Sequence, residues 1–313
     1  MSTKSEALVE EGKKVQENSI LLMLNFSSPG LRRSVARTDI ADSSSEDAED
    51  FAVQIDADPD MVYVSKQIIN SPEFRDIQSH RNGIKRALSN VGFKNIFRSG
   101  CFLVSLDTLN EIDSYVEGKV AEDGVLVNKF IAAYPGQKEQ AKKLRALYNE
   151  ADYPTVEALK ASFKITKRYF TFSTPTSLKG INKEVYDRER EKTEEFWRNA
   201  ASQVESALCA SFSGLVNHAV DRLTGAEDGK PKMFGDAALK KINNFLAVFE
   251  KRNLTRNGEL EVLVNKAKKV ISGLDGAALR EGQVRDSVKK GFEPIKKALD
   301  SMMMQKPGRK IRL

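Results

Sequence analysis

One long helical pattern, from about Asn182 to Leu223, constrains the fold of this chain more than any other feature. Only Gly214 interrupts it, and its apolar residues recur every three or four positions, which places them on one face of a helix. Their spacing averages close to an eleven-residue repeat, which is the period of a nearly straight helix and not of a left-handed coiled coil. The residues are Trp197, Ala201, Val204, Leu208, Phe212, Leu215, Ala219 and Leu223.

Three shorter amphipathic patterns follow the long one. The first begins at Asp236, the second carries apolar residues from Leu260 to Ile271 and ends at Gly273, and the third runs from about Ala277 to Met304. Glycine directly after a helical pattern is a common helix stop. Together these patterns predict a bundle of long helices over residues 176–304.

The first part of the chain mixes short strands with helices. Alternating or continuous apolar runs predict strands at Ile20–Phe26, Met61–Val64, Phe102–Val104 and Ile165–Phe172. Helical patterns lie between the last two, at Leu106–Val116, Val125–Tyr134 and Lys138–Tyr148. The predicted fold class is therefore α+β and predominantly α-helical, with a small N-terminal sheet region followed by a long-helix bundle.

The predicted domain organisation follows from these patterns. Residues 1–18 are polar and are expected to form a flexible N-terminus, and residues 19–175 form the α+β region. An insert over residues 39–60 has nine acidic residues and no basic one, so it is expected to be disordered. Residues 176–304 form the bundle, and 305–313 form a basic tail.

The charge of the chain is unevenly distributed. The formal net charge is +6, and without the acidic insert it is +15. A basic body of this kind suits phosphate backbones, whose binding is mostly electrostatic. The acidic insert is able to cover the basic surface, but a solvated loop is the simpler explanation.

Several classes of protein are excluded by composition. Two cysteines and two histidines do not provide a disulfide scaffold or a common metal cluster. No apolar stretch approaches the ~20 residues of a membrane span, and the N-terminus lacks the character of a secretory leader. No acid, base and nucleophile are recognisable together, so we expect a cytoplasmic, non-enzymatic protein without cofactor or metal.

Two groups of residues remain as candidate binding sites. Basic and aromatic side chains alternate on the last predicted strand, as they do in proteins that stack single-stranded bases and neutralise phosphates. With the tail, this candidate nucleic-acid site comprises Lys164, Lys167, Arg168, Tyr169, Lys306, Arg309, Lys310 and Arg312. The alternative is a strand with one core face and one ordinary surface face. The second group, Met302, Met303 and Met304, is either core or a contact for a partner.

Several segments together resemble a family of uncharacterised bacterial and phage proteins described only as a domain of unknown function. They are residues 62–74, 98–104, 149–154, 221–224, 229–234 and 249–253, and the resemblance spans about Ile20 to Leu279. Other members often have tryptophan where this chain has Phe26. Genes of this family often lie beside those of a MoxR-type AAA+ ATPase and a von Willebrand A-type protein. The resemblance implies an accessory role on a mobile element and supplies no catalytic residue.

Two functions are consistent with these observations. The first is a phage or mobile-element adaptor that binds a protein partner, such as a MoxR-type AAA+ ATPase, or assembles with itself. The alternative is a protein of phage DNA metabolism that binds single-stranded DNA.

Overall fold

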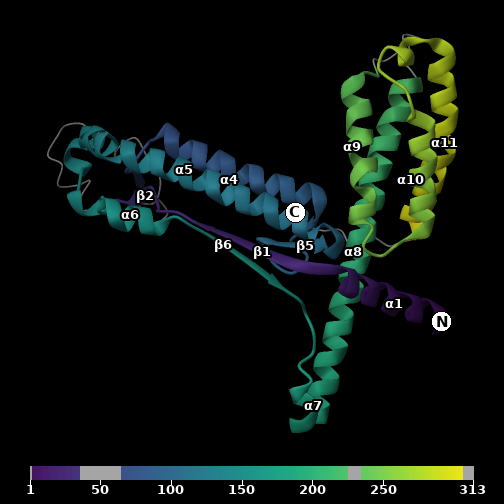
Figure 1. Ribbon diagram of the computed structural model, residues 1–313, viewed down its shortest axis with the longest axis horizontal. Coiled ribbons are helices and arrows are strands. Elements are labelled where there is room, and N and C mark those ends of the chain that lie inside the picture. The colour runs from purple at the N-terminus through teal and green to yellow at the C-terminus, as the bar shows by residue number, and fades with distance from the viewer. Residues whose placement is uncertain (1, 36–64, 225–233, 306–313) are drawn as a thin grey trace, which may run out of the picture. The chain divides into compact units, whose positions relative to one another are not determined.

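The computed structural model describes residues 2–35, 65–224 and 234–305 of the chain. These residues are mostly helical and include a small four-stranded sheet and a two-stranded sheet, which confirms the predicted fold class (Figure 1). The predicted insert at 39–60, the strand at Met61–Val64 and the tail residues Lys306, Arg309, Lys310 and Arg312 lie outside the described residues. None of the described helices is long and apolar enough to cross a membrane.

The chain divides into two compact units that interleave along the sequence. Unit 1 comprises Met1–Leu22, Leu88–Asn110 and Tyr169–Leu313, and unit 2 comprises Met23–Ala87 and Glu111–Arg168. This differs from the predicted boundary at residue 175. The reason is that α1 (Ser2–Asn18), although distant in sequence, packs against the long helix of unit 1.

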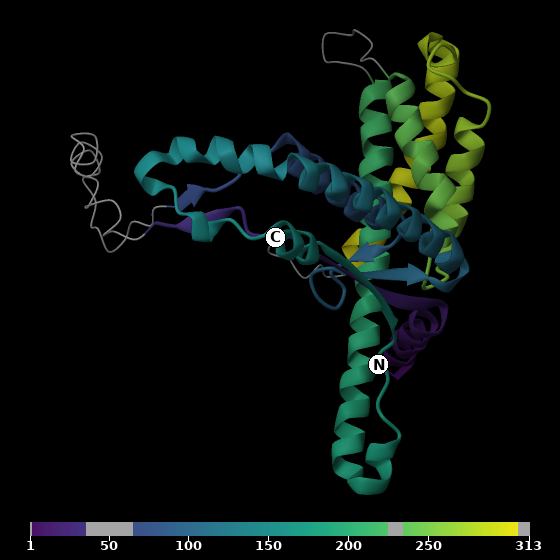
Figure 2. The ribbon, with the colours of Figure 1, turned by 60° about the vertical axis from the view of Figure 1, so that its left-hand side comes forward.

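Unit 1 is built around the predicted long helix, which is α8 (Lys183–Thr224). Three helices, α9 (Asp236–Arg252), α10 (Gly258–Ile271) and α11 (Gly282–Gln305), lie beside its C-terminal part (Figures 1 and 2). The predicted stripe is buried except for Leu215, which is half-buried at its edge. The adjacent residues Ala200, Glu205, Cys209, Ser213, Val216 and Val220 are buried as well, because several helices cover α8.

Residues 2–18, which the sequence predicted as a flexible segment, form α1 in the structure. This helix packs on α8 so closely that the two backbones approach each other at Gly12. A Cβ atom at position 12 would lie 3.0 Å from the Arg198 nitrogen and 3.1 Å from the Trp197 carbonyl carbon. Val15 is fully buried in the same contact region of unit 1. The sequence suggested flexibility because few of these residues are apolar. The packing of α1 depends on two of them, the small Gly12 and the buried Val15.

The four-stranded sheet has the order β4-β5-β1-β6. Its strands are β1 (Ser19–Ser27), β4 (Phe93–Lys94), β5 (Cys101–Ser105) and β6 (Lys164–Phe170), and β4 pairs antiparallel with β5. Three of these strands confirm the sequence predictions at Ile20, Phe102 and Ile165. The residues of β1 and β6 belong partly to unit 1 and partly to unit 2.

Unit 2 contains most of α4 (Pro72–Val91) and α5 (Leu109–Ala141), which lie side by side (Figures 1 and 2). Its two-stranded sheet pairs β2 (Arg32–Ser34) antiparallel with β3 (Ser65–Gln67), and α6 (Val156–Ser162) packs on the same core. The buried residues of this core include Ile69, Phe74, Ile77, Phe130, Tyr134 and Leu159.

Short helices complete the two units. In unit 1 they are the turn Leu106–Thr108, α7 (Ser177–Ile181) and the turn Ala278–Arg280. In unit 2 they are the turns Lys142–Leu147 and Glu150–Asp152.

Candidate functional site

The basic and aromatic strand predicted from sequence is β6, but its central lysine is already neutralised. Lys167 Nζ donates to Asp113 Oδ1 at 2.6 Å and also to Glu117 Oε1, both on α5. Burial lowers the pKa of Lys167, but the hydrogen bonds to the two carboxylates outweigh it, so the pKa is raised overall. The charge of Lys167 is therefore engaged within unit 2. We predicted Lys167 as a contact for nucleic acid, and in the structure its ammonium group is already hydrogen-bonded to these two carboxylates.

The other predicted residues of β6 have different surroundings. Lys164 and Arg168 are exposed, whereas Tyr169 is half-buried. The next aromatic residues, Phe170 and Phe172, do not continue an exposed platform, because they pack against the core of unit 1. The strand thus presents cations to solvent but places most of its aromatic surface inside.

An aromatic cluster in unit 1 was not predicted. The ring of Phe97 lies 5.8 Å from Phe170, 4.9 Å from Phe172 and 6.1 Å from Phe196, measured between centroids. Phe97 is 39% exposed, so this cluster reaches the surface. Its members come from three distant segments, and no spacing in the sequence connects them. The basic residues Lys94 and Arg98 lie on the same β4–β5 hairpin and are exposed.

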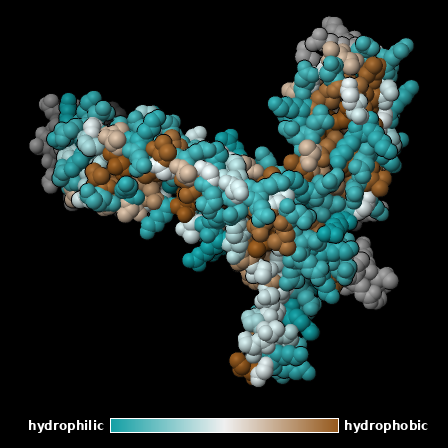
Figure 3. Space-filling model, in the orientation of Figure 1, coloured by the Kyte–Doolittle hydropathy of each residue, from teal (hydrophilic) through white to brown (hydrophobic). Residues whose placement is uncertain are grey.

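In unit 1, α7 and the start of α8 form a helical hairpin, here called the α7–α8 hairpin (residues 177–196). The buried residues of α8 begin only at Trp197, so about 20 Å of helix precedes the core of unit 1. At the turn between the two helices, Ile181 is 80% exposed. Figure 3 shows hydrophobic surface at the end of this hairpin.

The hairpin is held in shape by specific contacts. Asn182 joins its two helices, because its backbone N–H donates to the Leu178 carbonyl while its Oδ1 accepts from the Val185 N–H at 3.1 Å. At its base, Trp197 Nε1 donates to the Phe172 carbonyl at 3.0 Å. Between the turn and the base, the Thr174 hydroxyl donates a hydrogen bond to the Thr193 hydroxyl at 3.0 Å. Ile181 is therefore presented from an ordered turn.

The outer surface of the hairpin is strongly charged. Ion pairs join Arg190 to Asp187 and Glu194, and Lys192 to Glu189, all at helical spacings of three or four residues. Lys192 lowers the pKa of Glu189 through their hydrogen bond. Such exposed pairs contribute little each, but they favour helix in a segment with no apolar core.

The predicted methionine site lies at the end of α11 and divides into two parts. Met302 is half-buried and packs against the core of unit 1. Met303 is 45% exposed and Met304 is 85% exposed. The core reading therefore applies to Met302, and a contact of Met303 and Met304 with a partner stays a prediction.

Reactive side chains do not gather within the described part of the chain. No group of three or more His, Cys, Asp or Glu residues there is arranged to hold a metal ion. Cys101 and Cys209 are both buried free thiols, and burial raises the pKa of Cys209. A raised pKa disfavours the reactive thiolate.

Comparisons with family models, with curated proteins and with solved structures find no match to this chain. The proposed function is therefore based on the geometry and exposure of the side chains of this chain.

Proposed function

We propose that this chain is a non-enzymatic accessory protein that binds a protein partner through the α7–α8 hairpin. The observation that supports it most is the exposure of Ile181 at an ordered turn, well beyond the first buried residue of α8. An apolar side chain on a rigid support loses little conformational entropy on binding. The exposed Met303 and Met304 provide a second contact.

The partner proposed here is a MoxR-type AAA+ ATPase, as the sequence resemblance implies, and the setting is a phage or mobile element. The protein acts in the cytoplasm and needs neither cofactor nor metal. Self-assembly through the same hairpin is the competing form of this proposal. The two forms are distinguishable, because self-assembly depends on the concentration of this chain alone, whereas binding to the ATPase also depends on the concentration of the ATPase.

The test is a binding titration of the full chain with a purified MoxR-type ATPase from a genome that encodes both, alongside light scattering of the chain alone. We expect Ile181→Asp to weaken partner binding at least about tenfold, since truncation of a central apolar anchor has an effect of this size. Val262→Asp is the matched control, because Val262 is 53% exposed on α10, away from the hairpin. Equal effects of the two substitutions, or unchanged binding in both, would contradict the proposal. Concentration-dependent dimerisation lost in Ile181→Asp would support self-assembly instead.

Binding of single-stranded DNA is the second candidate, and the aromatic cluster around Phe97 is the observation that favours it. An exposed ring flanked by Lys94 and Arg98 has the chemistry of a base-stacking contact. Fluorescence anisotropy with labelled single- and double-stranded oligonucleotides tests it at low and near-physiological salt. Affinity that decreases steeply with salt and is lost in Phe97→Ala would support this function. Affinity unchanged in Phe97→Ala would exclude the cluster as the site.

A further inference from the structure

The strand β6 lies at one edge of the four-stranded sheet, because the order β4-β5-β1-β6 gives it a single neighbour among the described strands. Its residues 164–168 belong to unit 2, as do residues 23–27 of β1. An edge strand presents a row of backbone N–H and C=O groups to which an extended peptide can add as a further strand. The α7–α8 hairpin proposed above as the partner site belongs to unit 1, so this edge is a separate surface.

The side chains of this strand alternate between two different faces. Ile165 and Lys167 are half-buried on the face toward α5. Lys164, Thr166 and Arg168 are exposed on the opposite face. Neither Lys164 nor Arg168 forms an ion pair within the described part of the chain. The outer face therefore offers two cations, separated by one uncharged residue.

An open pocket of about 330 Å³ lies beside this strand, between β6, α5 and α6. Its apolar lining comes from Val120 and Val127 on α5 and from Phe163 and Ile165 at the start of β6. Lys160, in the last turn of α6, adds an exposed cation. The strand β1 contributes no residue to this lining, so the pocket lies on the β6 side of the β1–β6 pair. An apolar side chain of an added strand would find a partner surface there.

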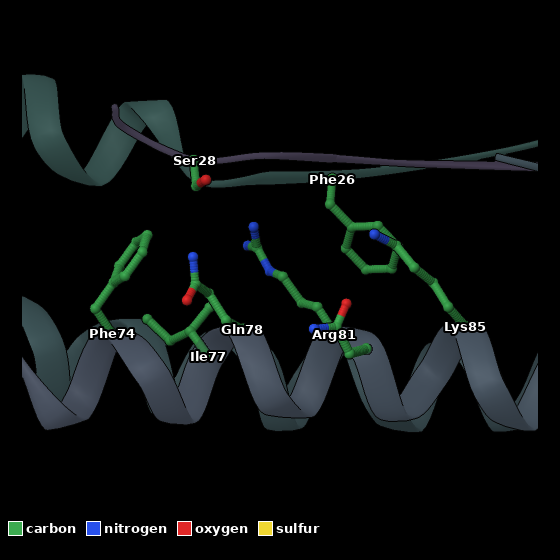
Figure 4. A pocket seen from close by; sticks show the side chains of 8 residues that line it. Phe26, Ser28, Phe74, Ile77, Gln78, Arg81 and Lys85 are labelled. Atoms are coloured by element: carbon green, nitrogen blue, oxygen red, sulfur yellow. The ribbon is translucent and has the colours of Figure 1, made fainter. Parts of the chain in front are cut away.

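Arg81 holds this part of unit 2 in place from α4. Its Nε and Nη2 donate to the two carboxylate oxygens of Asp123, which also lines the pocket, and its Nη1 donates to the Ser27 carbonyl, all at 2.8 Å. Its guanidinium carbon lies 5.6 Å from the ring centres of both Phe26 and Phe163. Figure 4 shows Arg81 extending from α4 toward the segment that carries Phe26. One arginine thus joins β1, the start of β6 and α5, and an edge fixed in this way loses little conformational entropy on binding.

A second copy of this strand is a poor occupant of the edge. If two copies of β6 paired antiparallel about Thr166, Lys164 of each copy would lie opposite Arg168 of the other. Like charges opposite each other on neighbouring strands are destabilising, and lysine on an edge strand is a common protection against such pairing. The same two cations favour a strand that places acidic side chains on this face.

We propose that the edge of β6 binds an extended peptide in which acidic side chains alternate with apolar ones. The peptide backbone pairs with residues 164–168, and its acidic side chains lie beside Lys164 and Arg168. Its apolar side chains point to the other face, because successive side chains of a strand alternate, and one of them enters the pocket next to Ile165. Main-chain hydrogen bonds supply affinity, and the charges and the pocket supply specificity.

The test is fluorescence polarisation of three labelled peptides of equal length with the full chain. The first alternates glutamate with valine, the second lysine with valine, and the third glutamate with serine. We expect the first to bind at least about tenfold more tightly than the others, because the second places like charges on the two cations and the third loses the apolar contact. Absence of binding by the first peptide, or equal binding of the first and either of the others, would overturn the proposal.

Two N-methylated versions of the glutamate–valine peptide test the backbone pairing. One lacks the N–H groups along one edge of the peptide, and the other lacks those along the opposite edge. An added strand pairs through a single edge, so one version should lose binding and the other should keep it. Unchanged binding of both versions would overturn strand addition. A single-stranded oligonucleotide of equal charge is the competitor, and tighter binding of the oligonucleotide would assign the surface to nucleic acid instead.

A pair of glycine substitutions on α5 locates the pocket. Gly124 lies on the stripe of α5 that lines it and has open space around the position of a Cβ atom. Gly124→Leu should therefore fill the pocket and weaken binding of the glutamate–valine peptide at least about fivefold, through loss of apolar burial. Gly118→Leu is the matched control, because Gly118 has the same open space but lies outside the lining. Equal effects of the two substitutions would contradict the assigned site.

The two cations are tested in the same way. Lys164→Gln and Arg168→Gln should each weaken binding up to about fivefold, the range for an exposed charge. Arg86→Gln removes an exposed charge from α4 and should leave binding unchanged. An effect of Arg86→Gln as large as those of the two strand variants would show that only the overall charge matters and would contradict the proposal.

Discussion

Asn257 connects α10 to α8 through a single side chain. Its Nδ2 donates to Glu205 Oε1 at 2.9 Å, while its Oδ1 accepts from the Leu260 N–H at 2.9 Å. Glu205 is only 2% exposed, on the apolar face of α8. One residue therefore caps the start of α10 and provides a donor to a buried carboxylate, which would otherwise be costly.

Replacement of Asn257 should separate these two roles. We expect Asn257→Ala to lower the free energy of unfolding by about 2–4 kcal/mol, through loss of the cap and of a bond to a charged group. Asn257→Ser keeps a capping oxygen but is too short to reach Glu205, so it should lose about half as much. Urea unfolding measures both. A loss below about 1 kcal/mol in the alanine variant would show that neither contact matters.

The close approach of α1 and α8 predicts opposite effects of alanine at two glycines. Gly12→Ala should destabilise the protein by about 1–3 kcal/mol, because its Cβ would press on the backbone of α8. Gly214→Ala, within α8 and with open space around it, should stabilise by up to about 1 kcal/mol. Thermal unfolding of the two variants distinguishes them. A stabilising effect of Gly12→Ala would mean that the two helices are further apart than described.

The ion pair between Arg81 and Asp123 should behave as a coupled unit. Arg81→Met leaves Asp123 buried without its partner, and we expect a loss of about 3–5 kcal/mol. Asp123→Leu should have a similar cost for the same reason. The double variant removes both charges and should cost clearly less than the sum of the single ones. A double-mutant cycle in urea tests this, and strict additivity would argue against a buried pair.

Tyr148 provides a test at alkaline pH. Its hydroxyl donates to Glu150 Oε2 at 2.5 Å, and this hydrogen bond raises the pKa of Tyr148 to about 12. Because the folded pKa lies above the ordinary value near 10, the bond stabilises the fold fully below about pH 10. That contribution is lost as the pH rises toward 12. Phenolate absorbance should show a late step that Tyr148→Phe removes and Glu150→Gln moves to lower pH. A late step that persists in Tyr148→Phe would assign it to another tyrosine.

Local patterns predicted the helices and strands of unit 1 well. The long helix was expected over Asn182–Leu223 and is observed at Lys183–Thr224, because its apolar stripe is continuous. The helix α5 was expected in three pieces, but it continues through Pro135. Its buried residues Val127, Phe130 and Tyr134 belong to the core of unit 2, and this packing offsets the local cost of proline.

The candidate sites were harder to predict from sequence. The neutralisation of Lys167 depends on carboxylates that precede it by 54 and 50 residues. The buried ion pair of unit 2 did leave a local signal. Arg81 occupies the apolar stripe of α4, between Ile77 and Ile84, and Asp123 occupies the stripe of α5. Opposite charges at buried positions of successive helices indicate a buried ion pair, which the apolar periodicity of each helix alone does not predict.

The interleaving of the two units has a consequence for synthesis on the ribosome. The N-terminal helix α1 emerges early, but Gln16 bonds to Phe172, which lies 156 residues later. At about 5–20 residues per second, roughly 8–30 seconds pass between the translation of these two residues. During this interval the early segments of unit 1 are exposed without α8. We therefore expect the nascent chain to need protection by chaperones until that helix has been made.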